Sequence, residues 1–465
     1  MLRSASLLFD HLRMMPSNPR DGQLRRSLLL SYGLGSVAPT VAHEFCGAFV
    51  FLFYTELMHL DPIWVGYALL IRMIVDAVVD PVIGYVSDRT RCRSGRRRPY
   101  FLVGSSPGLV LLVLTFMPPE GSASFQFAYL AIISSLMAAC FSVAAIPHMA
   151  MAFELSPLHH QRVRVVGYRN FIESLSSLLA LLSGPIFLAL AGMSFFGHQL
   201  ARADCYRLGA VMIGISGLLA TMVAFAGTAE GPPAADEGQY GFWHGVYSAL
   251  RNQPFRTLLL VYVCLVVANR VALAQIFLLL EHFHGIKEED TIPLLLSFYL
   301  GALSGTPVWS LIGTRVSQFR ALVAAIILWP LSFVALVAFS SPGSLLMLIT
   351  FGMGASFAGI LLMLGTIAPT ILDLDRIQSG KRREGLYAST INLVLQMGIG
   401  IGYLSTGVVL SLIGLNGSQP PTADMVLGLR FSTAGFPVFL ACVALLFIWW
   451  RPIHLKTGTS HGLEH

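Results

Sequence analysis

Two acidic residues, Asp76 and Asp80, are four positions apart within an apolar stretch that runs from Trp64 to Val86. Residues spaced i, i+4 share one face of an α-helix, so the two carboxylates would be neighbours. Carboxylates are costly inside an apolar helix, and a low-dielectric site that keeps both ionised needs a cation, a proton or a basic partner. The pair therefore indicates a cation-binding site.

A basic residue, Arg72, stands four positions before Asp76 and on the same helix face. It can supply part of the missing positive charge. Two acids against one base still leave a net negative site, which favours an exchangeable cation. The alternative is a salt-bridge network that only holds neighbouring helices together.

The composition determines what kind of chain must position these residues. The 465 residues are 55% hydrophobic and only 12% charged, with a mean hydropathy of +0.71. Such a chain is a polytopic membrane protein rather than a soluble globule. Stretches long enough to span a bilayer are predicted at residues 31–58, 62–86, 99–117, 125–153, 163–192, 207–227, 255–283, 292–313, 320–340, 343–372, 385–413 and 431–450.

Charge and loop composition predict the orientation and the division of the chain. Most of the 30 Lys and Arg residues fall on one side if both termini are cytoplasmic, so topology explains the net charge of +6 better than nucleic-acid binding does. No cleavable signal peptide is evident. The longest polar connection is rich in Pro, Gly and acidic residues and reads as a linker. The predicted parts are a cytoplasmic tail (1–30), a six-helix bundle (31–227), a cytoplasmic linker (228–254), a second six-helix bundle (255–450) and a cytoplasmic tail (451–465).

Three motifs carry a family resemblance: DAVVDPVIGYVSDRTRCRSGRRRP at 76–99, SGKRREGLYAS at 379–389 and SYGLGS at 31–36. Together they resemble the glycoside–pentoside–hexuronide:cation symporters of the major facilitator superfamily, the group that includes the bacterial melibiose carrier. The resemblance implies an all-α membrane protein with twelve transmembrane helices in two six-helix halves. It also implies transport by alternating access, with the solute bound between the halves near mid-membrane.

The resemblance assigns the coupling cation, sodium or a proton, to Asp76 and Asp80, with Ser142 as a hydroxyl ligand. The sequence departs from the family pattern at Gln396, where the resemblance leads us to expect a lysine on the eleventh span. The loss of that lysine gives Arg72 its proposed role as the compensating cation.

The family's sugar-binding positions correspond to Thr40, Ala145, Met149 and Arg169, and only Arg169 keeps the expected residue type. The carboxylates and the aromatic ring that recognise a sugar are missing from the other three. A simple galactoside is therefore not expected. The chain is also similar to sodium-coupled lysophospholipid carriers, whose apolar cavity would suit these small and apolar side chains.

Other polar residues admit two interpretations each. Glu44, beside His43, is a candidate proton or substrate site, or a bridge between helices. Arg169 is four residues before Glu173, so the two can neutralise each other instead of binding substrate. Asp88 and Arg89, in the loop motif, are expected to act in gating at the cytoplasmic side.

These observations predict a secondary active transporter for symport of a small organic solute, either glycoside-like or an amphiphile such as a lysophospholipid. It is expected as a monomer in the lipid of a bacterial-type inner membrane, with no cofactor beyond the coupling ion and no nucleic-acid partner. An uncoupled facilitator or exporter is the first alternative. A polytopic enzyme or sensor is a remote one, because no nucleophile and base arrangement, metal cluster or phosphate loop is visible.

Overall fold

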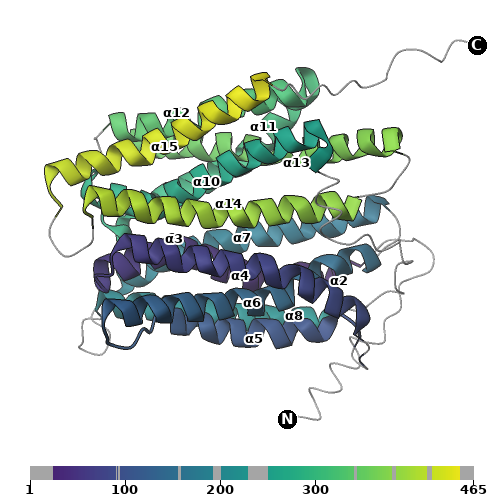
Figure 1. Cartoon of the computed structure of the whole chain (residues 1–465), viewed down its shortest axis with the longest axis horizontal. Coiled ribbons are helices and arrows are strands. Elements are labelled where there is room, and N and C mark those ends of the chain that lie inside the picture. The colour runs from purple at the N-terminus through teal and green to yellow at the C-terminus, as the bar shows by residue number, and fades with distance from the viewer. Residues whose placement is uncertain are drawn as a thin grey trace, which may run out of the picture. The chain divides into compact units, whose positions relative to one another are not determined.

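The structure is a computed structural model, and it describes residues 25–90, 92, 95–155, 159–191, 201–228, 250–339, 343–379, 384–415 and 421–450. Among these residues every regular element is a helix (Figure 1). The helices are α2 (Arg26–Leu34), α3 (Val37–Leu52), η1 (Phe53–Leu57), α4 (Pro62–Arg89), α5 (Arg98–Thr115), α6 (Ala123–Leu155), α7 (His159–Ala191), α8 (Arg202–Gly227), α10 (Gln253–His282), η2 (Glu288–Thr291), α11 (Ile292–Arg315), α12 (Gln318–Ala338), α13 (Ser344–Ser379), α14 (Glu384–Ile413) and α15 (Ala423–Trp450).

Twelve helical segments of the described chain are long and apolar enough to cross a membrane, with α2, α3 and η1 together making the first of them. The prediction of an all-α protein with twelve spans is confirmed. Backbone polar groups cannot find water in hydrocarbon, so helices that satisfy their own hydrogen bonds are the expected solution for such a sequence. The chain is therefore an integral membrane protein.

The first span differs from the single uninterrupted stretch predicted at 31–58, because it breaks between α2 and α3 at Gly35 and Ser36. The Ser36 hydroxyl donates to the Gly33 carbonyl at 2.7 Å, which competes with the helical hydrogen bonds. A Cβ on Gly35 would lie 2.6 Å from Nε2 of His148, so the chain needs a glycine at this close approach. The last turn, Phe53–Leu57, is a π-helix.

Several helices begin at caps that the sequence supplies. Asp61 precedes Pro62 and accepts a hydrogen bond from the Ile63 amide at 2.9 Å, which starts α4. Asn252 accepts from the Phe255 amide at 3.3 Å at the start of α10. These side chains satisfy backbone donors that have no partner within the helix.

The chain divides into two compact units. Unit 1 comprises Met1–Gly238, Gly285–Ile292 and Tyr403–Met425, and unit 2 comprises Gln239–His284, Pro293–Gly402 and Val426–His465. The η2 segment and the carboxyl-terminal part of α14 thus belong to unit 1, although they interrupt the sequence of unit 2. The residue boundaries predicted for the two bundles and their linker remain predictions.

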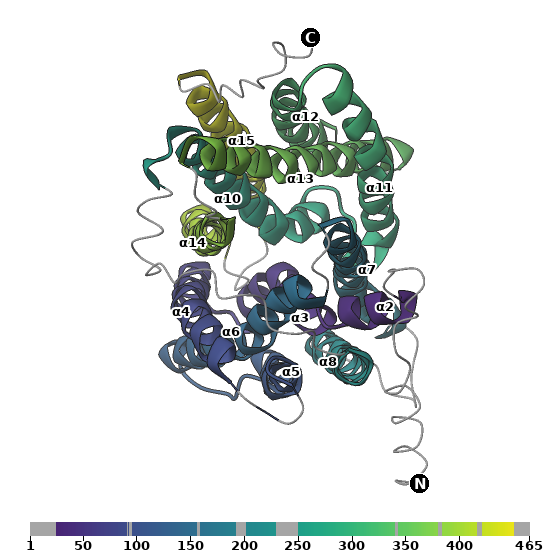
Figure 2. The same ribbon diagram turned by 90° about the vertical axis from the view of Figure 1, so that its right-hand side faces the viewer.

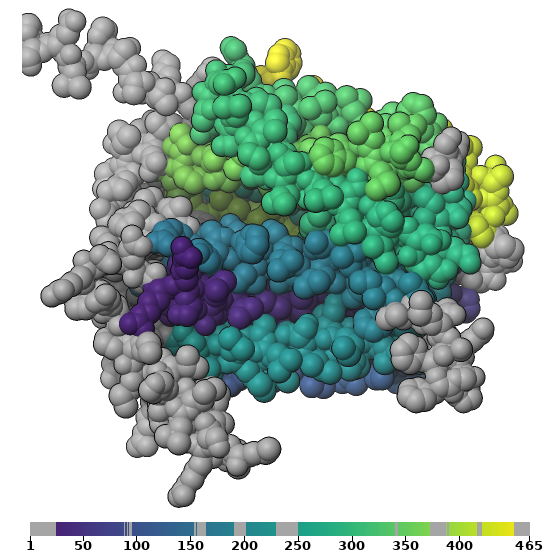
Figure 3. Space-filling model, turned by 180° about the vertical axis from the view of Figure 1, so that it is seen from behind, coloured from purple at the N-terminus to yellow at the C-terminus, as the bar shows by residue number. Residues whose placement is uncertain are grey.

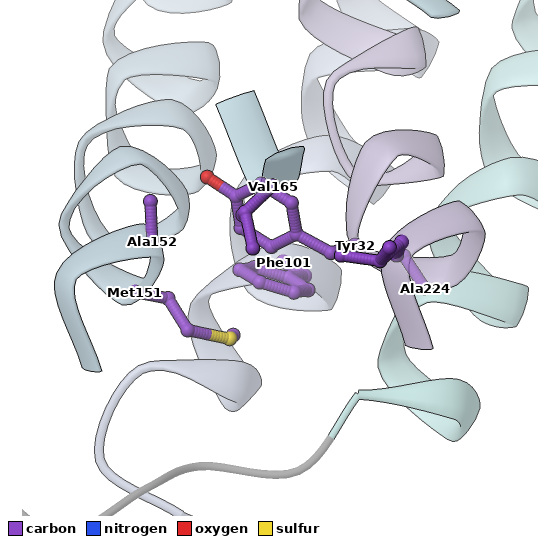
Figure 4. Packing of buried hydrophobic residues seen from close by; sticks show 7 residues of the cluster. Tyr32, Phe101, Met151, Ala152, Val165 and Ala224 are labelled. Carbon is purple, nitrogen blue, oxygen red and sulfur yellow. The ribbon is translucent and has the colours of Figure 1, made fainter. Parts of the chain in front are cut away.

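Within unit 1, α6 packs against both α4 and α5, as the view along the helices makes clear (Figure 2). On another face of this unit α2 lies between α7 and α8 (Figure 3). A buried cluster joins α2, α5, α6, α7 and α8 and contains Leu29, Tyr32, Phe101, Met151, Ala152, Val165 and Ala224 (Figure 4). The packing of α4 on α6 positions the cation-site candidates.

Within unit 2, close helix packing depends on glycines. A Cβ on Gly354 of α13 would overlap the Phe298 carbonyl oxygen of α11, and one on Gly301 would overlap the Phe351 carbonyl oxygen. Small residues at such positions let backbones approach closely in membrane proteins, where no hydrophobic force drives helices together. The helix α12 packs along α13 in the same unit.

Candidate functional site

The centre of the candidate site is a hydrogen bond between two neighbouring helices of unit 1. The Ser142 hydroxyl on α6 donates to Oδ1 of Asp76 on α4 over 2.5 Å. Both side chains are buried, with exposed fractions of 4% for Ser142 and 9% for Asp76. The structure therefore brings together the acid and the hydroxyl that the sequence analysis assigned to one cation.

Arg72 lies one turn before Asp76 on α4 and is 3% exposed. It lies within electrostatic range of Asp76. Its Nε and Nη1 atoms are nonetheless buried without a hydrogen-bond partner among the described residues. The predicted proximity is thus present, but the two side chains do not form a direct ion pair.

Asp80 is half-buried one turn beyond Asp76 on the same helix. The residues assigned to the site are two carboxylates, a hydroxyl and one guanidinium. Oxygen donors of this kind suit a hard cation. Among the described residues, no three His, Cys, Asp or Glu side chains converge as a metal site.

The residues predicted to line a substrate site are distributed over several helices. Thr40 and Glu44 are one turn apart on α3, and Ala145 and Met149 are one turn apart on α6. Met149 is 40% exposed, and the other three are half-buried. Gln396 lies on the part of α14 that belongs to unit 2, where its Oε1 atom is buried without a hydrogen-bond partner among the described residues.

Arg169 of α7 forms the ion pair with Glu173 that its spacing allows, with 2.6 Å between Nη2 and Oε1. Its Nε atom donates to the same oxygen at 2.7 Å. The Arg169 and Glu173 side chains are 21% and 26% exposed, so the ion pair is only partly buried. Its charge is already matched, which weakens the case for Arg169 as the anchor of a substrate.

Tyr32 and His148 form a pair that no pattern in the sequence predicts. The Tyr32 hydroxyl donates to the His148 carbonyl oxygen at 3.1 Å, and the His148 ring Nε2 lies 2.7 Å from the Tyr32 carbonyl oxygen. The two rings also stack, with 4.4 Å between their centroids. The residues are 116 positions apart in sequence, so only the packing of α2 on α6 reveals the contact.

The gating candidates lie at the end of α4. Arg89 is stacked over the ring of Tyr85, with its guanidinium carbon 3.5 Å from the ring centroid. Asp88 lies on the same turn of helix, and its side chain falls outside what the structure describes. Their proposed gating role remains a prediction.

A second contact missed by the sequence analysis joins η2 to α8 within unit 1. Glu288 is 4% exposed and accepts a hydrogen bond from the Tyr206 hydroxyl. Arg202 lies 3.4 Å away from the same carboxylate oxygen. The sequence KEED at 287–290 is typical of a polar loop and does not predict that one of its carboxylates is buried.

Twelve apolar spans, with buried polar side chains on α4, define a polytopic membrane protein. The sequence profile of the family described as MFS/sugar transport protein matches residues 31–454, and the chain belongs to this family. The family is one of major facilitator transporters, so the chain is a transporter and the enzyme alternative is excluded.

Several named proteins are similar to this chain over nearly its full length. The chain is 24% identical to a protein named uncharacterized symporter YnaJ of Bacillus subtilis, with 90% of each chain covered. It is 22% identical to the glucuronide carrier protein homolog of Escherichia coli, with 93% of each covered. It is 20% identical to the sodium-dependent lysophosphatidylcholine symporter 1-A of Danio rerio, with 94% of this chain and 88% of the relative covered.

A solved structure confirms the fold. The xylose transporter XylE of Escherichia coli, in a partially occluded inward-open conformation, superposes with a TM-score of 0.62 at 13% identity, covering 91% of this chain and 98% of XylE. The major facilitator fold predicted from the sequence is therefore confirmed.

Proposed function

We propose that this protein is a cation-coupled symporter that binds sodium or a proton at Asp76 and Asp80, with Ser142 completing the site. The 2.5 Å hydrogen bond between Ser142 and Asp76 carries the proposal, because it holds an acid and a hydroxyl from two helices at one buried point. A cation there would relieve the repulsion between two carboxylates on α4. Only a cation that binds one conformation better than the other can drive a conformational change.

Arg72 lies near Asp76 and reduces the demand for a cation there without forming a direct ion pair. An adjacent buried guanidinium also lowers the affinity of the site for a positive ion. We therefore expect the cation to bind weakly. The site would then fill on the side of the membrane where the cation is concentrated and release it on the other side. Such reversibility is what a coupling site needs.

The transported solute is proposed to be a small organic molecule, either glycoside-like or an amphiphile such as a lysophospholipid. The names of the relatives from Escherichia coli and Danio rerio support both classes. The candidates for contact with this solute are Thr40, Glu44, Ala145, Met149, Arg169 and Gln396. The small and apolar side chains at Ala145 and Met149 favour the amphiphile, since they offer no hydrogen bonds to sugar hydroxyls.

The experiment compares thermal unfolding of purified wild-type protein and Asp80→Asn in sodium, in potassium and at several pH values. A ligand that binds only the folded state raises the melting temperature, so the cation site can be tested before any solute is identified. If sodium or protons stabilise the wild type but not Asp80→Asn, the result supports coupling. An equal response of the two proteins contradicts it.

The second candidate function is an uncoupled facilitator or exporter. It is favoured by one observation, the buried Arg72, which supplies a permanent positive charge near Asp76 without any bound cation. Uptake into vesicles then equilibrates the solute and never concentrates it, whatever ion gradient is applied. Accumulation above equilibrium under a sodium or proton gradient excludes this candidate.

The proposed location is the cytoplasmic membrane of a bacterial-type cell, with both termini on the cytoplasmic side and the protein as a monomer. The distribution of basic residues supports the orientation. Reporter fusions to the two termini test it, because both must report the cytoplasmic side.

A further inference from the structure

The middle of α10 contains a charged residue, Arg270, in a span that is otherwise apolar. Its Nη1 atom is buried and has no hydrogen-bond partner among the described residues. Within the described residues of unit 2 the guanidinium also makes no ion pair. The residue as a whole is half-buried, so part of it is accessible. A cation inside an apolar span whose buried donor has no partner is costly, so this arrangement calls for an anion that the described residues of the unit do not supply.

The spans of unit 2 offer no acid at the depth of Arg270. The one acidic residue in α10 is Glu281, eleven positions further along the helix. A helix rises 1.5 Å per residue, so the two are separated by about 16 Å. The described residues of α12 contain no acid, and neither do the apolar windows of α11, α13 and α14 that lie in unit 2.

Close packing fixes the position of Arg270. A Cβ on Gly402 of α14 would lie 2.7 Å from Cβ of Arg270, and one on Gly398 would lie 3.3 Å from Cγ1 of Val266. Two glycines four residues apart on α14 therefore let α10 approach closely in a parallel sense. The stem of Arg270 therefore packs directly against the α14 backbone at Gly402.

The partnered arginines of the described chain show how this sequence otherwise satisfies such groups. Arg169 is neutralised by Glu173 at 2.6 Å. Arg430 donates to the Val337 carbonyl oxygen at 2.8 Å and lies 4.0 Å above the Phe283 ring. Arg270 has neither kind of partner among the described residues of its own unit, so it differs from arginines that serve only to hold the fold.

We propose that Arg270 binds an anionic group of the transported solute, a carboxylate or a phosphate. A guanidinium presents planar paired donors that match such oxyanions and remains charged at any physiological pH. Gln396 on α14 also has a buried side-chain oxygen without a hydrogen-bond partner among the described residues. This inference rests on the proposed transport function and narrows its substrate class to organic anions or zwitterions.

The test uses two pairs of probes that differ in one charged group. One pair is 4-nitrophenyl β-glucuronide and 4-nitrophenyl β-glucoside, and the other is oleoyl lysophosphatidate and monooleoylglycerol. Affinity for each probe is measured by its effect on the melting temperature of the purified protein in lipid nanodiscs. The two pairs separate a carboxylate on a sugar from a phosphate on an amphiphile.

We expect the wild type to prefer the charged member of at least one pair. In Arg270→Gln the affinity for the charged probe falls about tenfold or more, because hydrogen bonds to charged groups are strong. The affinity for the neutral probe is unchanged. Arg270→Lys retains part of the preference. Arg207→Gln, which removes an arginine already paired with Asp204, is the matched control and leaves the preference intact.

If Arg270→Gln does not fold, Gly402→Ala provides the second variant, since its methyl group displaces the Arg270 stem without removing the charge. It should weaken binding of the charged probe. The proposal is overturned if the wild type prefers neither charged probe, or if Arg270→Gln or Gly402→Ala keeps the full preference. Stabilisation by sodium without any organic probe reports the cation site separately, so failure here is distinguishable from failure of coupling.

Discussion

Gly407 of α14 lies against Gly66 of α4 with almost no space between the two backbones. A Cβ on Gly407 would overlap the Pro62 carbonyl oxygen and would be 3.1 Å from the Gly66 Cα. Both glycines lie within unit 1, although most of α14 belongs to unit 2. Within unit 1, this contact holds the carboxyl-terminal part of α14 against the helix that carries the cation-site candidates.

The first prediction concerns this contact. Gly407→Ala should lower the melting temperature of the purified protein by several degrees, because the obstructing atoms are backbone and cannot move aside cheaply. Gly435→Ala in α15 is the control, since a Cβ there meets nothing within 4 Å. Equal melting temperatures for the two variants would show that α14 can shift without cost.

The sequence predicted the helices well because length and apolarity alone determine them in a membrane. The predicted 292–313 span became Ile292–Arg315. The break at Gly35 was not predicted, since it depends on where the His148 ring lies in the finished fold. Local spacing does not encode contacts of this kind.

The candidate site was predictable only in part. The i, i+4 spacing placed Arg72 and Asp76 correctly on one face, and family resemblance rather than spacing pointed to Ser142. The burial of Glu288 could not be predicted from the sequence, because the residues of an acidic loop are normally solvated. Arg270 lies within the predicted span 255–283, and the structure adds that its buried Nη1 atom has no hydrogen-bond partner among the described residues.

The second prediction concerns Ser142. Ser142→Ala should weaken the stabilisation by sodium or protons about tenfold in apparent affinity, because it removes a hydroxyl that orients Asp76 and can ligate the ion. Ser142→Thr keeps the hydroxyl and should retain most of the effect. A titration of melting temperature against cation concentration measures both, and an unchanged midpoint in Ser142→Ala would remove the hydroxyl from the site.

The third prediction concerns the paired Tyr32 and His148. Tyr32→Phe removes one hydrogen bond and should cost about 1 kcal/mol of stability. Gly35→Ala should cost more, because its methyl group would lie 2.6 Å from the buried His148 ring and disturb both the stacking and the remaining hydrogen bond. Unfolding of the three proteins in the same detergent gives the order, and a Gly35→Ala variant as stable as Tyr32→Phe would show that the ring can move.

The fourth prediction concerns Glu288, which attaches η2 to α8. Glu288→Gln keeps the shape of the side chain but weakens the interactions with Tyr206 and Arg202, since charge-assisted hydrogen bonds are the stronger ones. It should lower the melting temperature more than Glu289→Gln, whose partner Lys287 is 74% exposed. An equal effect of the two substitutions would indicate that η2 contributes nothing to unit 1.

The last prediction is a pH dependence that arises from His284, which lies just beyond the end of α10. Burial lowers the pKa of His284 below its ordinary value, the nearby Leu336 backbone partly opposes this, and the nearby charge of Arg430 adds to the lowering. The folded state therefore binds this proton less readily than the unfolded chain does. Stability from this group is complete above the ordinary histidine pKa of about 6.5 and is lost progressively as the pH falls.

The histidine effect is measured as the melting temperature between pH values of about 7.5 and about 5, where about 6.5 is the unfolded reference. Wild type should lose more stability on acidification than His284→Gln, which cannot be protonated. His282→Gln is the control, because His282 stands two residues earlier at the end of α10 and is less buried. Parallel pH profiles for wild type and His284→Gln would mean that the ring is solvated and titrates normally, in which case the chain after α10 is open to water.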